Sequence, residues 1–143
     1  MRYQQAVDFY RHVAVETADP LSLVIMAYEG ALGAIDRAVC ALREGDYQRK
    51  GEEIQKAMDL ISELMAALDL ERGGQVARSL SSLYTYFLKR LMTGNAKKDE
   101  GALLEVRDLL AQLCSAWGEI ARAGAGKAAF GESWLMEPGE GTP

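Results

Sequence analysis

AMDLISELMAALDLERGGQVARSLSSLYTYFLKRLM, residues 57–92, decides the fold of this chain. Apolar residues recur through both halves at alternating steps of three and four, the spacing of one helix face. These residues are Met58, Ile61, Met65 and Leu68, preceded at the same spacing by Ile54, and then Val76, Leu80, Leu83, Phe87 and Leu91. Gly73-Gly74 interrupts the pattern and tolerates the left-handed conformation common just past a helix end. The stretch predicts two amphipathic helices that other helices must cover, because such helices are stable only when their apolar face is buried.

Two further helices are predicted on either side of this hairpin. Asp19 can cap a helix that has Pro20 at its first position and ends near Gly45. Asp46 can cap the helix that runs to about Leu70, and the next helix is predicted from about Gln75 to Met92. Asp99 can cap the last helix. The apolar faces of the two flanking helices consist of Leu21, Ile25, Tyr28, Leu32, Ile35, Val39 and Leu42, and of Leu103, Val106, Leu110, Leu113, Trp117 and Ile120.

The connections between these helices are short, so consecutive helices must be antiparallel neighbours. The predicted fold class is all-α, an antiparallel up-down-up-down four-helix bundle with a short N-terminal helical segment packed outside. We expect residues 1–18 to form that amphipathic segment, residues 19–122 the bundle, and residues 123–143 a flexible C-terminal tail rich in Gly and Pro. Phe130 and Trp134 are unusual in such a tail. They either contact the bundle loosely, are simply exposed, or form a docking peptide that occupies a groove on this or another protein.

Composition narrows the classes of function. The chain has 143 residues and a net charge of −5, with 49% hydrophobic and 8% aromatic residues. A negative surface repels phosphate backbones and anionic lipid, so nucleic-acid binding is not expected. No segment approaches the roughly 18 continuous apolar residues of a membrane helix, and the N-terminus has no apolar signal region. These features predict a cytoplasmic protein that does not insert into membranes.

Catalytic and metal-binding patterns are missing from the sequence. His12 is the only histidine, and it lies outside the predicted bundle, whereas a carboxylate-bridged metal centre needs Glu-x-x-His pairs on two helices. Cys40 and Cys114 are predicted to be small buried hydrophobes about 15 Å apart along the bundle, too far for a disulfide. The acidic residues Glu52, Glu53, Asp59 and Glu63 resemble an ordinary solvated face. We therefore predict no enzyme, no cofactor and no metal.

Apolar residues outside the predicted helix faces suggest a binding protein. Rotation by 100° per residue places Leu23, Met26 and Ala27 opposite the apolar face of their helix. Further partner-binding candidates are Leu60, Tyr84, Tyr86 and Leu88. Together these side chains predict grooves that accept amphipathic helices from a partner. The N-terminal stripe of Tyr3, Val7, Tyr10 and Val13 has the size to cover Leu23, Met26 and Ala27, although a disordered terminus is the alternative.

Several stretches, in this order, resemble one known family. They are Thr17-Ala18-Asp19-Pro20 with Leu23-Val24-Ile25-Met26-Ala27-Tyr28-Glu29-Gly30-Ala31, Leu64-Met65-Ala66-Ala67-Leu68-Asp69 with Gly73-Gly74, Leu80-Ser81-Ser82-Leu83-Tyr84, and Leu109-Leu110 up to Trp117. From Tyr3 to about Trp117 the chain resembles the flagellar secretion chaperones of the FliS type.

That resemblance implies a cytoplasmic export chaperone that binds the disordered C-terminal segment of flagellin and prevents premature polymerisation. It also implies delivery to the flagellar type III export apparatus, with the export gate as a second partner, and movement of the segment carrying Tyr3 and Tyr10. We expect a monomer or weak dimer. A self-associating helical-bundle scaffold without a flagellin client is the alternative, and it would use the same apolar residues to join copies of itself.

Overall fold

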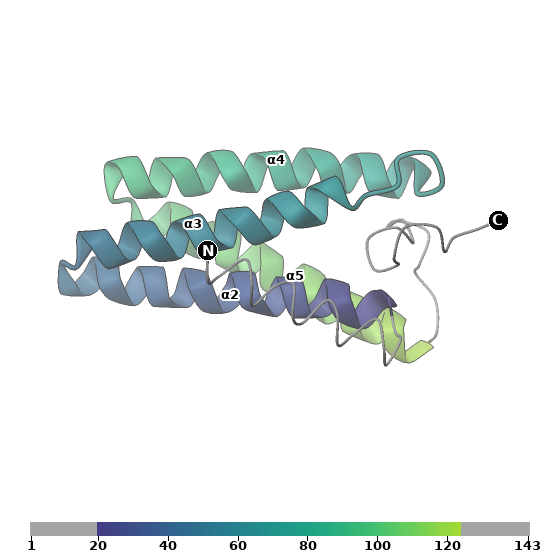
Figure 1. Cartoon of the computed structure of the whole chain (residues 1–143), viewed down its shortest axis with the longest axis horizontal. Coiled ribbons are helices and arrows are strands. Elements are labelled where there is room, and N and C mark those ends of the chain that lie inside the picture. Colours follow the sequence, from purple (N-terminus) through teal and green to yellow (C-terminus); the bar gives the residue numbers. More distant parts are fainter. Residues whose placement is uncertain (1–19, 124–143) are drawn as a thin grey trace.

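The computed structural model describes residues 20–123, and this range forms four α-helices (Figure 1). They are α2 (Pro20–Glu44), α3 (Tyr47–Ala66), α4 (Gly74–Lys97) and α5 (Glu100–Ala123). The predicted all-α helical bundle is confirmed. The expected N-terminal segment, the expected cap Asp19 and nearly all of the expected tail lie outside the described residues.

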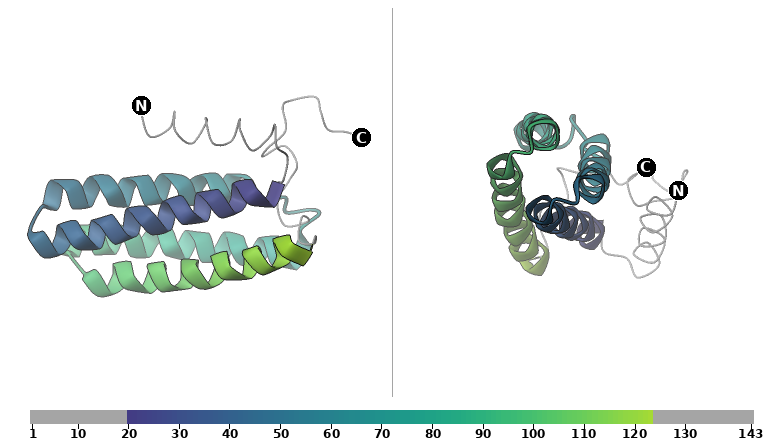
Figure 2. Two further views of the ribbon diagram at one scale, coloured as in Figure 1. Left: turned by 90° about the horizontal axis from the view of Figure 1, so that it is seen from below. Right: turned by 90° about the vertical axis from the view of Figure 1, so that its left-hand side faces the viewer.

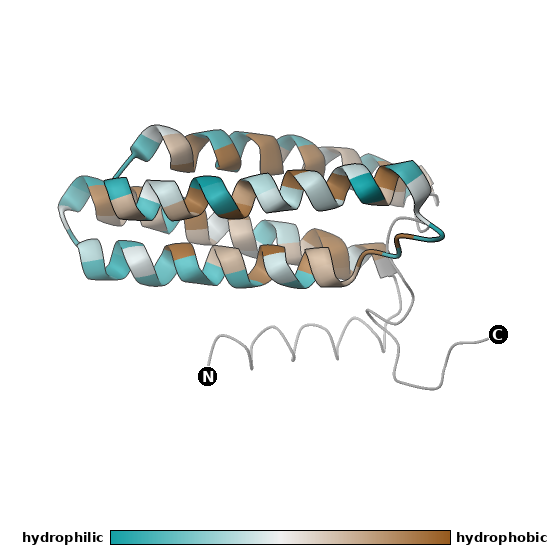
Figure 3. Ribbon diagram, turned by 90° about the horizontal axis from the view of Figure 1, so that it is seen from above, coloured by the Kyte–Doolittle hydropathy of each residue, from teal (hydrophilic) through white to brown (hydrophobic). Residues whose placement is uncertain are grey.

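The four helices pack as a ring in which each helix contacts two neighbours. Helix α2 packs against α3 and α5, and α4 packs against the same two helices. The ribbon reverses its direction at each short connection, and the end-on view in Figure 2 shows one helix at each corner. Figure 3, which looks onto the side of α4, shows apolar and polar positions alternating along each helix. The apolar positions therefore meet between the helices and form one core.

Most of the predicted apolar faces supply this core. Fully buried side chains from all four helices include Tyr28, Ile35, Ile54, Ile61, Phe87, Leu91, Leu103 and Leu110. Val76 is an exception, because 58% of this residue is exposed in the first turn of α4. Tyr84 takes part in the core instead, although the predicted apolar face of its helix did not include it.

Two of the predicted helix caps are present. The Asp46 carboxylate accepts a hydrogen bond from the Arg49 backbone N–H at 3.1 Å, and Asp99 accepts one from the Ala102 backbone N–H at 3.2 Å. Between α2 and Asp46, Gly45 has a φ of 78°, a left-handed conformation that glycine adopts without steric strain. The end of α2 and the beginnings of α3 and α5 therefore follow from local sequence chemistry.

Two helix ends differ from the prediction. Helix α3 ends at Ala66, before Leu70, whereas α4 continues through Gly94-Asn95 to Lys97. Gly94 is buried against α5, and a Cβ atom at this position would lie 2.6 Å from Cδ2 of Leu103. The glycine therefore permits close packing of α4 on α5 and does not end the helix. Lys98, with a φ of 52°, forms the actual C-cap.

The predicted solvated acidic face is wrong at Glu53, which is buried between α2 and α3. Its carboxylate accepts hydrogen bonds from Arg37 Nε at 3.0 Å and from Lys56 Nζ at 3.4 Å. The two helices approach closely nearby, because a Cβ atom on Gly30 would lie only 2.8 Å from Cδ1 of Leu60. This close approach covers the side of α3 that carries Glu53. The buried carboxylate of Glu53 is therefore stabilised by its hydrogen bonds to Arg37 and Lys56.

Replacing Glu53 by glutamine should lower the free energy of unfolding by about 1 kcal/mol, because a charge-assisted hydrogen bond is lost while the partners stay half-exposed. The neighbouring variant Glu52→Gln is the matched control, since Glu52 is exposed and should change stability by less than about 0.5 kcal/mol. Urea unfolding of both variants measures the difference. Equal stability of the two variants would contradict a structural role for the Glu53 ion pairs.

Candidate partner-binding surfaces

A stripe of uncharged side chains follows the seam between α3 and α4. Met58 and Met65 are seven residues apart and therefore share one face of α3. The Thr85 hydroxyl of α4 lies 3.6 Å from the Met65 sulfur, which places the two helix faces side by side. Leu88 and Met92 continue the α4 face at spacings of three and four. We call these five residues the α3–α4 methionine face.

This methionine face combines partial exposure with apolar chemistry. Met92 is 58% exposed, while Met58, Met65 and Leu88 are half-buried against the core. None of the five side chains carries a charge. Methionine is unbranched and polarisable, so it adapts its shape to different apolar surfaces. The methionine face can therefore receive the apolar side of a helix from another protein.

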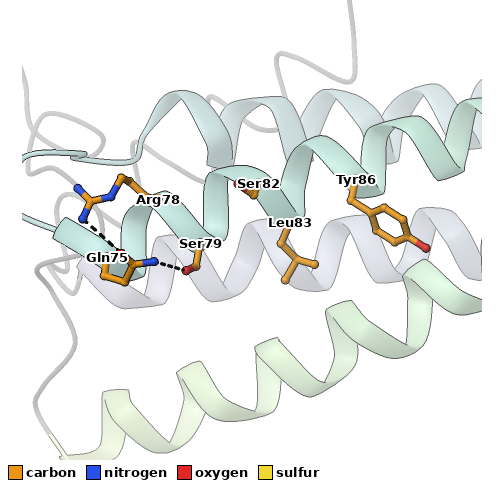
Figure 4. A pocket seen from close by; sticks show the side chains of 6 residues that line it. All are labelled: Gln75, Arg78, Ser79, Ser82, Leu83 and Tyr86. Carbon is orange, nitrogen blue, oxygen red and sulfur yellow. Dashed lines mark hydrogen bonds between the residues drawn. The ribbon is translucent and has the colours of Figure 1, made fainter.

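A second surface feature is a pocket of about 550 Å³ on α4 (Figure 4). We call it the α4 groove, and it is lined by Gln75, Arg78, Ser79, Ser82, Leu83 and Tyr86. The Tyr86 hydroxyl donates a hydrogen bond to Glu105 of α5, and Arg90 Nε donates a second one at 2.8 Å. These hydrogen bonds, together with the Arg90 charge, lower the pKa of Glu105, so that its carboxylate stays ionised beside the groove.

Charge sets α4 apart from the rest of the molecule. The helix carries the four basic residues Arg78, Lys89, Arg90 and Lys97 and no acidic residue, in a chain whose net charge is −5. Each of the other three helices carries several Asp or Glu residues. The surface of α4 is therefore the part of the described chain best suited to an acidic segment.

Several predicted contact residues prove to be buried. Leu23, Ala27 and Leu60 are at most 8% exposed and form no open apolar surface here. Ala27 and Leu60 belong to the core, and Leu60 packs over Gly30 where α2 meets α3. A helix in a bundle is covered on both flanks, which widens its buried arc beyond the predicted face.

Other predicted contacts do lie at the surface. Tyr86 is 40% exposed in the α4 groove, Leu88 lies in the methionine face, and Met26 is half-buried on α2. The candidates Tyr3, Val7 and Tyr10 lie outside the described residues. Sequence reasoning missed the methionine face, because it assigned Met58 and Met65 to the core and did not consider Met92. Methionines seven residues apart on α3 were the available signal.

Tyr84, another predicted contact, instead lies at the centre of the bundle. Its hydroxyl shares a hydrogen bond of 2.6 Å with Tyr28 of α2, and the two rings meet edge to face at 6.3 Å. Burial raises the pKa of both phenols. Hydrogen bonds from Tyr84 and Trp117 partly offset this rise in the pKa of Tyr28. Both hydroxyls therefore remain neutral and link helices from opposite corners of the ring.

Residues 20–123 offer neither a cluster of metal ligands nor a membrane-spanning helix. This range contains no group of three or more His, Cys, Asp or Glu side chains that could hold a metal ion. None of its helices is both long and apolar enough to cross a bilayer. Cys40 and Cys114 are free thiols, as predicted, but Cys40 is exposed and Cys114 half-buried, so the expectation of burial is wrong for Cys40.

Comparison with known proteins supplies the context for these surfaces. Residues 2–124 match the family model described as flagellar protein FliS. The chain is 41% identical over 121 residues to the flagellar secretion chaperone FliS of Salmonella typhimurium, an alignment that covers 84% of this chain and 87% of the relative. It is 35% identical over 124 residues to the flagellar secretion chaperone FliSB of Pseudomonas aeruginosa, and this alignment covers 84% of this chain and 98% of the relative. It is 34% identical over 117 residues to the flagellar secretion chaperone FliS of Bacillus subtilis, and this alignment covers 82% of this chain and 86% of the relative.

Proposed function

Since this chain belongs to the family of the flagellar protein FliS, we propose that it is a secretion chaperone whose client is flagellin. In this proposal it binds the disordered C-terminal segment of flagellin in the cytoplasm. Binding prevents premature polymerisation and presents the client to the flagellar export gate. The observation that carries the proposal is the α3–α4 methionine face, an uncharged strip along two adjacent helices.

The physical chemistry of this strip suits such a client. A disordered segment that folds on binding loses conformational entropy, so it needs a long apolar contact to compensate. Met58 and Met92 lie toward one end of the strip, and Met65 and Thr85 toward the other. An amphipathic helix placed along the strip would bury its apolar side against these residues. Affinity stays moderate because ordering the client offsets part of the contact energy, which favours later release.

Titration calorimetry of this protein against the C-terminal segment of its own organism's flagellin tests the proposal, together with circular dichroism of the mixture. We expect binding with a negative heat-capacity change, because apolar surface is buried. The helical signal of the mixture should exceed the sum of the two components, since the client folds on the chaperone. Absence of both binding heat and helix gain would contradict flagellin as the client.

The alternative, a self-associating scaffold, makes a different prediction. Apolar residues such as Met92 and Tyr86 would then join copies of this chain. Sedimentation of the isolated protein would show a discrete dimer or tetramer, and addition of the flagellin segment would not dissociate it. A monomer that binds flagellin would exclude the scaffold.

A further inference from the structure

The α4 groove begins at the end of the bundle where α5 stops. Tyr86 and Arg90 of α4 contact Glu105 of α5, and the two helices run in opposite directions from that contact. Helix α4 starts at Gly74, and α5 ends at Ala123. Figure 1 shows the start of α4 and the end of α5 at the same end of the bundle. The chain that follows Ala123 therefore starts near the groove.

The chain after Ala123 is long enough to enter the groove. Ala123 lies 18 residues beyond Glu105, which is about 27 Å along α5. Trp134 lies 11 residues beyond Ala123, and an extended chain of that length spans up to about 40 Å. Trp134 can therefore reach back along α4 as far as Leu83 and Tyr86 without any change in the bundle.

The chemistry of this segment complements the groove. Residues 130–137 have the sequence FGESWLME, which contains two aromatic side chains, one leucine, one methionine and two acidic side chains. The groove offers Leu83 and Tyr86 as apolar contacts and Arg78 as an exposed positive charge. Helix α4 carries no acidic residue, and the ionised Glu105 carboxylate of α5 beside the groove is paired with Arg90. Opposite charges and matching apolar surfaces on the two partners favour association.

We propose that the α4 groove is a docking site for residues 130–137 of the same chain. Trp134 packs against Leu83 and Tyr86, and the acidic side chains of the segment face Arg78. The proposal goes beyond flagellin binding and does not depend on it, because the groove and the methionine face lie on different sides of α4. Intramolecular docking has a high effective concentration, so weak contacts suffice to hold the segment.

Tryptophan fluorescence of the full-length protein tests this docking. Subtracting the spectrum of the Trp134→Phe variant, which retains Trp117, isolates the emission of Trp134. We expect that emission to be blue-shifted and protected from acrylamide, and to be independent of protein concentration. Emission and quenching equal to those of free N-acetyltryptophanamide would overturn the proposal. A signal that changes with protein concentration would also overturn it, because the segment would then dock on a second copy.

Two groove variants and one control locate the contact. Arg78→Glu and Leu83→Glu should each shift the Trp134 emission to that of an exposed indole and raise its quenching by acrylamide. Lys97→Glu makes the same charge change at the far end of α4 and should leave both readouts unchanged. Circular dichroism confirms that each variant is folded, and Arg78→Glu is the decisive variant if Leu83→Glu unfolds. Equal spectra for Arg78→Glu and Lys97→Glu would overturn the assignment to the groove. Flagellin is absent throughout, so failure here leaves the proposed client untouched.

Discussion

Tyr84→Ala should lower the free energy of unfolding by about 3–5 kcal/mol, the usual cost of removing a fully buried aromatic side chain. The substitution leaves a cavity between α2 and α4 and removes the edge-to-face contact with Tyr28. It also deprives the Tyr28 hydroxyl of its 2.6 Å partner in the core. Thermal or urea unfolding followed by circular dichroism measures the loss.

Tyr86→Ala is the matched control, because it removes the same side chain two residues further along α4, where 40% of the residue is exposed. We expect it to cost much less than Tyr84→Ala. Tyr84→Phe isolates the hydroxyl and should cost about 1–3 kcal/mol, since Tyr28 keeps its ring contact but loses a hydrogen bond. If Tyr84→Ala were no more destabilising than Tyr86→Ala, the central position assigned to Tyr84 would be wrong.

The second large effect concerns client binding. Met92→Glu, or Leu88→Glu, places a carboxylate in the methionine face, where a docked helix would bury it without a partner. We expect either change to weaken binding of the flagellin segment at least about 30-fold, equivalent to about 2 kcal/mol. Calorimetry with the same flagellin segment measures this change. The stability of the free protein should change little in Met92→Glu, because Met92 is exposed.

Val76→Glu provides the control for this experiment, since Val76 is on the same helix and is as exposed as Met92. It should bind flagellin like the unmodified protein. Met26→Glu tests the other predicted surface, the half-buried position on α2. Loss of binding in Met26→Glu together with normal binding in Met92→Glu would contradict the methionine face and assign the client to α2.

Sequence reasoning predicted those parts of the fold that depend on local chemistry. Alternating spacings of three and four identified most of the core, and the capping carboxylates of Asp46 and Asp99 marked where α3 and α5 begin. The end of α4 could not be predicted in this way. Gly94 resembles a helix terminator, but it is needed where α5 approaches, and only the packed structure brings Leu103 against it.

The candidate site was harder to predict than the fold, because exposure depends on neighbouring helices. An angular count around α3 alone cannot show that α2 covers both Leu60 and Glu53. It also cannot distinguish Tyr84, which faces the centre of the bundle, from Tyr86, which faces solvent two residues later. The family resemblance suggested a client without fixing contact residues. The methionine face required knowledge of which sides of α3 and α4 adjoin.

The use of methionine along the α3–α4 seam has a consequence for how this protein and its partner can diverge in evolution. A surface of branched or aromatic side chains would fit only one arrangement of side chains on the partner helix. Each substitution in the partner would then need a matching substitution in the methionine face. Unbranched thioether side chains at Met58, Met65 and Met92 can rearrange within the same contact. The partner sequence can therefore drift through many apolar combinations while the chaperone sequence stays constant.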